Sequence, residues 1–424
     1  MTWLRLAAAN LGLSPLTTTV NVVLMSLGTA SIVLLLLVGT QLSDTLSRDA
    51  RGIDLVLGAK GSPVQLVLSS VYHADVPTGN IAKHDADRWA TDSRVAEAIP
   101  LSLGDSYKGF RIVGTTHSYT NLYEAELAQG KLWDERMDVV AGSAAQAAGL
   151  EVGARFSGVH GLQEGGHSHD ATSYRVVGAL APTGTVLDRL ILTSSESVWA
   201  LHNPDGHDSD HEDASEEDHE DAHHEADEHD DHEESHHEAD EHDDQEITAM
   251  LLRYRSPLAA MTLPRAVNAD SALQAASPAS EVSRILQLVG IGFDGLRAFS
   301  WVLILTAALS IFAALYGSLR ARKNDLAMLR CLGATRWELL LVLLMEGLLL
   351  SGMGVALGFL VGHGITEVLG SWLASARGVT LTGQTWLTAE TTLLVGLLLV
   401  GLVAAVIPAV QAYRTDVART LAEV

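Results

Sequence analysis

Histidines and carboxylates crowd one segment of the chain, residues 202–246. Neutral imidazole and carboxylate together form a ligand set that suits zinc, and also nickel or copper. The segment holds 11 histidines and 23 acids without any lysine or arginine, and the run HHEADEHDD at 223–231 returns at 236–244. We therefore expect many overlapping metal sites in one flexible segment. The predicted ligands are His207, His211, His219, His223, His224, His229, His232, His236, His237 and His242.

Histidines outside this segment are fewer. His167 and His169 lie close together in GGHSHD and could add ligands, whereas His73 and His84 are isolated and are expected to be ordinary surface residues. A catalytic metal is not expected, because a catalytic site needs three fixed ligands, an open position and a dry cleft. The alternative is that 202–246 is a solvated acidic spacer with incidental histidines. If metal binds, binding should weaken as the pH falls through about 6.5, where imidazole becomes protonated.

Nearly all of the net charge lies in the same segment. The chain has a formal net charge of −25 from 52 acids and 27 bases, and only 29 of the acids lie outside 202–246. High charge and few apolar residues predict that the segment is disordered without metal and forms an excursion from a folded domain. The rest of the chain is close to neutral and very apolar, which is typical of a membrane protein.

Four apolar runs are each close to the ~20 residues that an α-helix needs to cross a bilayer. We expect transmembrane helices at 16–40, 296–318, 338–362 and 389–411. An acid inside the third run, Glu346, is expected to have a structural or interfacial role, although intramembrane carboxylates are in general candidates for function.

Basic residues predict the orientation of these helices. Arg5 precedes the first run, five basic residues lie between the second and third, and Arg414 and Arg419 follow the fourth. Because cytoplasmic flanks are enriched in lysine and arginine, we expect both termini in the cytoplasm and residues 41–295 on the opposite side. Cys331 is the only cysteine, so the domain at 41–295 contains no disulfide framework.

The segment 41–295 is expected to fold as a large mixed α+β domain that 202–246 interrupts. The expected strands are 53–57, 109–114, 174–180, 186–193 and 247–253. Helices are expected at 84–98 and 143–149, and one or more helices at 256–284. The other segments are an amphipathic helix at 1–15 on the inner membrane surface, a cytoplasmic connection at 319–337, a short loop at 363–388 and a tail at 412–424. The fold class is thus a membrane protein with four transmembrane α-helices and a large mixed α+β domain between the first two.

The connection SLRARKNDLAMLRCLGATRWELL at 318–340 predicts a short amphipathic helix flanked by bases. Gly333 can end this helix and Thr335 can cap the next one. Together with PAVQAYRTDVARTL at 408–421, the stretch resembles the FtsX-like permease family, which includes macrolide-exporter and lipoprotein-releasing permeases. The family pattern falls on Arg322, Asp325, Leu326, Ala327, Met328, Leu329, Arg330, Leu332, Gly333, Ala334 and Thr335.

The resemblance implies a permease of the bacterial inner membrane that works with a separate cytoplasmic ABC ATPase subunit. The chain has no G-x-x-x-x-G-K-[ST] phosphate-binding loop, so we expect ATP to bind only to that partner and the chain itself not to be an enzyme. By resemblance, the helix at 322–335 docks on the ATPase. The coupling residues would be Arg322, Asp325, Leu326, Met328, Leu329, Arg330, Leu332 and Gly333.

Other expected partners are a second copy of the chain in a homodimer, membrane lipid, and a periplasmic metal-binding or accessory protein, but no nucleic acid. No tightly bound cofactor is expected. Family members commonly transmit ATP-driven movement to the domain outside the membrane, and the histidine-rich segment suggests a link to zinc handling. One alternative is a lipoprotein- or peptide-releasing permease whose segment only buffers metal. Another is a signalling scaffold that controls a periplasmic enzyme.

Overall fold

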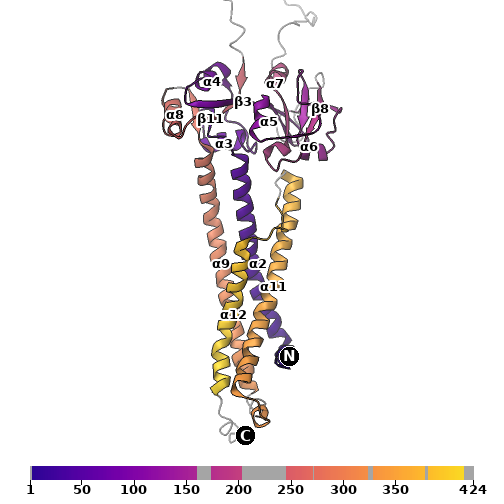
Figure 1. Ribbon diagram of the computed structural model, residues 1–424, viewed down its shortest axis with the longest axis vertical. Coiled ribbons are helices and arrows are strands. Elements are labelled where there is room, and N and C mark those ends of the chain that lie inside the picture. Colours follow the sequence, from indigo (N-terminus) through magenta and orange to yellow (C-terminus); the bar gives the residue numbers. More distant parts are fainter. Residues whose placement is uncertain are drawn as a thin grey trace, which may run out of the picture. The chain divides into compact units, whose positions relative to one another are not determined.

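The computed structural model describes residues 2–159, 173–202, 245–270, 272–322, 328–377 and 381–414. The chain divides into two compact units. Met1–Leu46 and Ser283–Val424 form the helical unit, and Ser47–Val282 form the sheet unit. Figure 1 shows the long helices of the first unit and the strands of the second.

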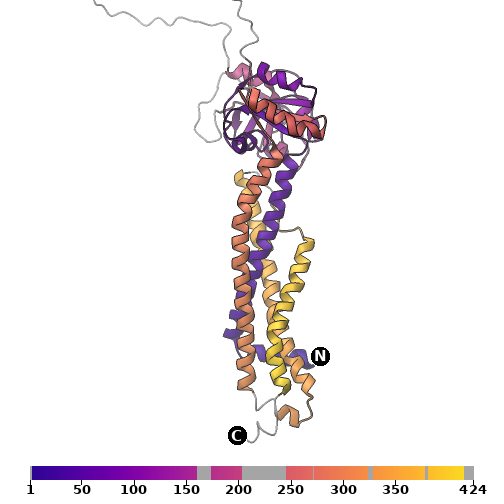
Figure 2. The ribbon, with the colours of Figure 1, turned by 90° about the vertical axis from the view of Figure 1, so that its left-hand side faces the viewer.

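Five helices of the helical unit lie wholly within the described residues. They are α1 (Thr2–Gly12), α2 (Pro15–Asp49), α9 (Pro278–Ala321), α11 (Arg336–Arg377) and α12 (Thr388–Arg414). The last four are long and apolar enough to cross a membrane, as the sequence predicts. Both ribbon views show α2, α9, α11 and α12 running side by side (Figures 1 and 2).

Three of these helices extend by nine or more residues beyond their predicted bounds, whereas α12 extends by at most three residues at either end. α2 continues to Asp49 and α9 begins at Pro278, so both reach into the segment predicted as the α+β domain. α11 continues to Arg377 and includes half of the segment 363–388, which we had expected to be a loop. These extensions contain good helix formers such as leucine, alanine and glutamine. They were missed because the prediction searched for continuous apolar runs, and a helix can continue beyond the end of such a run.

Glycines allow α11 to lie very close to α2. Gly354, Gly358 and Gly362 recur at a spacing of four on α11, and α2 presents Met25, Thr29 and Val33 to them at the same spacing. Residues four apart lie on one face of a helix, so the two rows meet along their length. Around this contact, Val33, Leu37, Ile304, Phe359 and Leu397 are buried in a core to which α2, α9, α11 and α12 all contribute.

α9 carries three further glycines, Gly290, Gly292 and Gly295, just before its apolar run. A Cβ built on any of them would meet nothing within 4 Å among the described residues. Packing within the described chain therefore does not require glycine at these positions.

The sheet unit is built on one mixed sheet with strand order β12-β1-β11-β3-β4-β9-β6-β8-β5, in which β7 also pairs with β8. Most neighbours are antiparallel, but β4 with β9 and β6 with β8 are parallel. The strands of this sheet are β1 (Leu55–Ala59), β3 (Val95–Tyr107), β4 (Phe110–Thr115), β5 (Leu127–Gly130), β6 (Asp138–Ala141), β7 (Arg155–Phe156), β8 (Tyr174–Leu180), β9 (Leu190–Ser194), β11 (Ala249–Tyr254) and β12 (Leu273–Ala276). A separate pair consists of β2 (Ile81–Ala82) and β10 (Glu246–Ile247).

Short helices cover this sheet, and two clusters of buried apolar side chains lie among the described residues of the unit. The helices are α3 (Pro63–Ser70), α4 (Lys83–Ala90), α5 (His117–Leu122), α6 (Ser143–Ala147), η1 (Val186–Arg189), α7 (Ser195–His202) and α8 (Pro257–Asp270). One core lies around β1, β11 and β12, where Leu57, Trp89 and Leu263 are buried. The other lies around β4, β6, β8 and β9, where Ile112 and Val176 are buried.

The predicted strands at 53–57, 109–114, 174–180 and 247–253 correspond to β1, β4, β8 and β11. The segment 186–193 divides into η1 and β9. The predicted helix at 84–98 is wrong in its second half, because β3 begins at Val95 and pairs with β11. The segment 256–284 contains two helices, α8 and the start of α9, in agreement with the prediction of one or more helices. The strand β12 between them was not predicted, and it pairs with β1.

The acid-rich segment leaves the sheet unit between α7 and β10. Residues 203–244 lie outside the described part of the chain. At its base, the indole N–H of Trp199 on α7 donates to the carbonyl oxygen of Glu246 at 2.6 Å. The amide of Asn80 donates to the Glu246 carboxylate at 3.1 Å. The two flanks of the segment are thus held together by one direct hydrogen bond, from Trp199 to Glu246, and Asn80 binds Glu246 from the residue before β2.

Candidate functional site

The connection between α9 and α11 contains the residues that the sequence singles out for coupling. Residues 328–331 are helical, and Gly333 follows with a φ of +106°. The Ala334 N–H donates to the Leu329 carbonyl oxygen at 3.1 Å and the Gly333 N–H to that of Arg330 at 3.1 Å. This pair of bonds around a left-handed glycine is a Schellman motif, so Gly333 ends the helix as predicted.

A capping box starts the next helix. The Glu338 N–H donates to Thr335 Oγ1 at 3.3 Å, and the Thr335 N–H donates to Glu338 Oε2 at 2.7 Å. The two side chains thereby satisfy backbone donors that the first turn of a helix leaves open. The stop at Gly333 and the start at Thr335 together fix the direction in which the chain turns from the coupling segment into α11.

Apolar side chains are exposed around this turn. Leu332 is 85% exposed, Met328 54% and Trp337 63%, and Trp337 also makes an edge contact with Tyr413 at a ring distance of 5.3 Å. Leu329 and Arg330 are half-buried. Asp325 and Leu326, which we predicted as coupling residues, lie outside the described residues. The described turn therefore presents an apolar surface of Met328, Leu332 and Trp337, which we call the coupling surface.

Arg322 and Glu346 both bind the N-terminal helix α1. An Arg322 guanidinium N–H donates to the Asn10 carbonyl oxygen at 3.3 Å. The Asn10 side-chain amide donates to Glu346 Oε1, and Glu346 is only 3% exposed. Asn10 thus links α1 to α11 and to the end of α9. The structural role expected for Glu346 agrees with this contact.

The predicted metal ligands lie in two segments, 160–172 and 203–244, that are outside the described part of the chain. The second of these segments contains ten of the predicted ligands, namely His207, His211, His219, His223, His224, His229, His232, His236, His237 and His242. The first contains the two additional candidates, His167 and His169. Within the described ranges, no group of three or more His, Cys, Asp or Glu side chains is placed to hold a metal ion. The sheet unit therefore offers no described metal centre beside the segment.

Two isolated histidines of the sheet unit have different surroundings. His84 is exposed, as expected. His73 is buried, which corrects the prediction that it lies on the surface. Its Nε2 lies 3.0 Å from the hydroxyl of Tyr119, and burial, with Arg111 and Arg189 nearby, holds the pKa of His73 well below its usual range. His73 is thus a neutral core residue of the sheet unit.

The end of α2 is anchored in the same region of the sheet unit. Asp49 Oδ1 accepts the Val186 N–H at 2.8 Å, and its carbonyl oxygen accepts the hydroxyl of Tyr123 at 2.6 Å. The preceding residue, Arg48, donates to the Gly184 carbonyl oxygen at 2.9 Å. The last turn of α2 is therefore held by the loop that leads into η1.

Sequence reasoning missed one acid that lies inside a predicted span. Glu390 is fully buried on α12, and its carboxylate lies 3.3 Å from His363 on α11. The general rule that ionisable residues within a span deserve a functional hypothesis would have selected Glu390. His363 could not have been paired with it from sequence, because the two residues lie on different helices.

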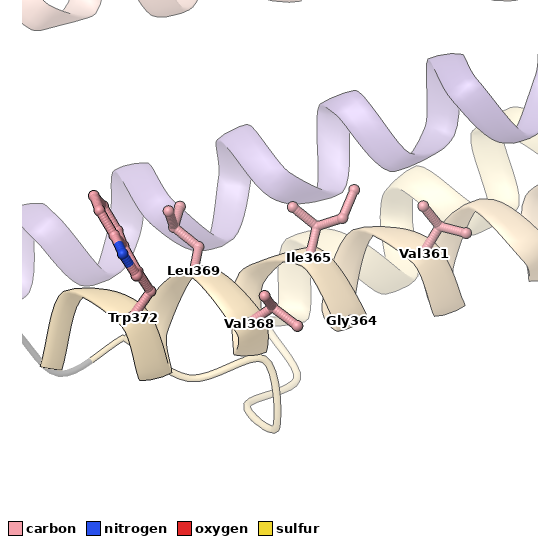
Figure 3. Close-up of a pocket in the computed structure, with 6 residues that line it drawn as sticks. All are labelled: Val361, Gly364, Ile365, Val368, Leu369 and Trp372. Atoms are coloured by element: carbon pink, nitrogen blue, oxygen red, sulfur yellow. The ribbon is translucent and has the colours of Figure 1, made fainter. Parts of the chain in front are cut away.

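An apolar groove runs along the same part of α11. It has a volume of about 600 Å³ and is lined by Val361, Gly364, Ile365, Val368, Leu369 and Trp372, all from this helix (Figure 3). The groove lies within a helix that is apolar enough to span a membrane, where an apolar surface of this kind is ordinary.

Comparison with known proteins identifies one part of the chain. Residues 297–417 match the family described as FtsX-like permease C-terminal. The match contains the apolar part of α9, the connection, α11 and α12, so the C-terminal part of the chain carries an FtsX-like permease domain. This confirms the resemblance expected from 318–340 and 408–421.

A solved structure is also similar to this chain, namely the periplasmic region of MacB from Actinobacillus actinomycetemcomitans. The two are 12% identical with a TM-score of 0.32, over 56% of this chain and 95% of that one. No curated protein matches the chain.

Proposed function

We propose that the chain is the permease subunit of an ABC transporter of the FtsX-like type. In this proposal both termini and the coupling surface lie in the cytoplasm of a bacterium, and the sheet unit lies in the periplasm. The observation that carries the proposal is the family match over 297–417, which includes the connection between α9 and α11. The position of basic residues on both flanks of this connection supports the orientation.

The proposed ATPase partner binds the coupling surface. Met328, Leu332 and Trp337 are large apolar side chains that water would otherwise cover, and such residues are the usual anchors of a protein interface. Arg322 and Arg330 add positive charge beside them. The Schellman motif at Gly333 and the capping box at Thr335 would convert a displacement of this surface into a displacement of α11, because they leave little freedom in the turn between them.

Movement would reach the sheet unit through continuous helices. α2 runs without interruption from Pro15 to Asp49, and its last turn is hydrogen-bonded to Val186, Tyr123 and Gly184. α9 likewise begins at Pro278, next to β12, and runs to Ala321. A helix transmits an axial or tilting movement over its length, so the two helices suit mechanotransmission from a cytoplasmic ATPase to the sheet unit.

The histidine-rich segment would give this movement a link to zinc. Its donors are imidazoles and carboxylates, which fit zinc and also nickel or copper. Zinc would be a substrate or regulator of the transporter, and its ligands would be the histidines from 207 to 242. The direct hydrogen bonds between Trp199, Asn80 and Glu246 at the base of the segment would pass a change in the segment to α7, β2 and β10.

The test measures the turnover of the partner ATPase, reconstituted with the full chain in lipid nanodiscs, as zinc is titrated. A variant that lacks residues 205–243 keeps Gln245 and Glu246, so that the bonds of β10 remain. A second variant keeps the length and the acids but replaces the ten predicted histidine ligands in this segment with asparagine. Zinc should change turnover with the unchanged chain and with neither variant.

Three other outcomes would contradict parts of the proposal. If zinc binds the segment but never changes turnover, the segment is a metal buffer, as in a lipoprotein- or peptide-releasing permease. If turnover responds to zinc in both variants, the metal acts elsewhere. If the chain does not change the turnover of any co-purifying ATPase, the transporter assignment itself fails. A signalling scaffold would instead produce cell chaining or lysis on deletion, without sensitivity to metals.

A further inference from the structure

His363 on α11 and Glu390 on α12 face each other within the helical unit. The Nδ1 of His363 lies 2.6 Å from the carbonyl oxygen of Gly383. A carbonyl oxygen can only accept a hydrogen bond, so Nδ1 carries a hydrogen and donates it. In a neutral imidazole the other nitrogen, Nε2, is then a bare acceptor, and it lies 3.3 Å from Oε2 of Glu390.

Glu390 has unusual surroundings for a carboxylate. It is 0% exposed, and neither of its carboxylate oxygens has a hydrogen-bond donor among the described residues. A buried anion without a partner is strongly unfavourable. Two acceptors that face each other add electrostatic repulsion. Both problems disappear if one proton lies on the pair, either on Nε2 as an imidazolium beside a carboxylate, or on Oε2 as a carboxylic acid that donates to Nε2.

The aromatic rings around His363 favour a positive charge there. The imidazole stacks on the indole of Trp386 with a ring distance of 5.8 Å and an angle of 8° between the planes. Phe359 stacks on the same two rings at 6.2 Å and 5.3 Å. A cation beside aromatic faces is stabilised by their quadrupoles, most strongly by that of tryptophan.

Among the described residues next to the pair, no positively charged side chain neutralises it. Glu367, four residues after His363 on α11, is negative, and its carboxylate accepts from the Gly383 N–H at 2.7 Å and from Thr382 Oγ1 at 3.1 Å. The side chain that α2 contributes here, Gln41, is neutral and exchanges two hydrogen bonds of 2.8 Å with the backbone of Thr382. The segment 381–387, LTGQTWL, contains no titratable side chain.

We propose that His363 and Glu390 form a binding site for one proton, and that the bound proton holds the segment 381–387 against α11 and α12. The site is independent of zinc binding and of the ATPase. The segment reaches it at Gly383 and Trp386, and a Cβ at Gly383 would clash with the backbone of His363, so segment and helix are in direct contact. Loss of the proton leaves a buried carboxylate facing a bare imidazole nitrogen, which pushes α12 from α11 and loosens Gly383 and Trp386.

The test uses the full chain in lipid nanodiscs with a metal chelator and measures tryptophan fluorescence between about pH 3 and about pH 10, a range that includes the ordinary titration of imidazole and carboxyl groups. An imidazolium next to an indole quenches its emission, and Trp386→Phe identifies the signal of this residue. The unchanged chain should show one pH-dependent step that is absent from Trp386→Phe. Glu390→Gln should lose the step, because a glutamine amide donates permanently to Nε2.

Two further variants keep the proposal open to refutation. Glu367→Gln is the matched control: it removes an exposed carboxylate one turn from His363 and should keep the step. If Glu390→Gln fails to fold, His363→Gln tests the same pair and should also lose the step. A step that persists in both His363→Gln and Glu390→Gln, or no step in the unchanged chain, overturns the proposal. A step that appears only when Zn²⁺ replaces the chelator assigns the site to a metal and overturns it equally.

Discussion

Gly358 on α11 lies directly against Thr29 on α2. A Cβ built on Gly358 would lie 2.5 Å from the Cβ of Thr29 and 2.7 Å from the carbonyl oxygen of Ser26, distances that real side chains do not adopt. Helices in lipid associate by close van der Waals packing, for which small residues are needed at the interface. The contact between α2 and α11 therefore depends on the missing side chain at position 358.

We predict that Gly358→Ala destabilises the helical unit. The added methyl group must force α2 and α11 apart, and overpacking of this kind costs about 1–3 kcal/mol. Gly364→Ala is the matched control on the same helix, because a Cβ there meets nothing within 4 Å among the described residues. Thermal unfolding of both variants in the same detergent checks the prediction, and equal melting temperatures would contradict it.

A second prediction concerns the turn before α11. Gly333→Ala places a side chain at a φ of +106°, where L-residues other than glycine are strained by roughly 1–2 kcal/mol. The Schellman motif should open, and hydrogen exchange at the amides of Gly333 and Ala334 should become faster. Gly317→Ala serves as control, since it is helical and its Cβ would be in open space. Unchanged exchange in Gly333→Ala would show that the motif is not what fixes the turn.

The third prediction tests the coupling surface. Leu332 is 85% exposed, so Leu332→Glu should leave the melting temperature of the chain unchanged. If Leu332 anchors an ATPase, burial of the new charge should weaken binding at least about tenfold, which corresponds to the loss expected for an interface anchor. Leu332→Met retains the apolar contact and should bind normally. Equal affinities of the two variants, measured by titration with the purified ATPase, would exclude Leu332 from the interface.

The fourth prediction follows from the lowered pKa of buried His73. In the unfolded chain a histidine takes up a proton below about pH 6.5, whereas folded His73 does not. Neutral His73 therefore makes its full contribution to the free energy of unfolding above that pH. This contribution is lost as the pH falls below about 6.5, by up to about 1.4 kcal/mol per pH unit.

Thermal unfolding of the sheet unit, recorded at a series of pH values, checks whether stability falls as the pH falls. Both the parent and His73→Gln should lack residues 205–243, so that the segment's own histidines do not contribute. The parent should lose stability more steeply than His73→Gln as the pH falls below about 6.5. Parallel curves would mean that His73 is protonated in the folded chain.

The sequence predicts the elements whose signal is local. The four apolar runs become α2, α9, α11 and α12, and the helix stop at Gly333 and the cap at Thr335 occur where glycine and threonine predict them. The strand β1 was likewise predicted from the alternation of Ile53, Leu55 and Leu57. In each case the residues within one element determine its structure.

Elements that depend on distant partners were missed. Val95 begins a strand instead of continuing a helix, because Glu97 and its neighbours pair with β11, more than 150 residues later. The short strand β12 has the helix-like sequence LQAA and becomes a strand only because β1 offers it an edge. The pair of His363 and Glu390 required knowledge of how α11 packs on α12, which periodicity within one helix does not contain.

α9 has one further property, which concerns its stiffness. Its 44 residues correspond to about 66 Å of helix, roughly twice the ~30 Å of a hydrocarbon layer. Gly290, Gly292 and Gly295 each weaken the helix by about 0.5–1 kcal/mol relative to alanine, and all three lie within two turns. The resistance of α9 to bending is therefore lowest just before Phe299, and curvature should concentrate there while the apolar length beyond it remains a straight rod.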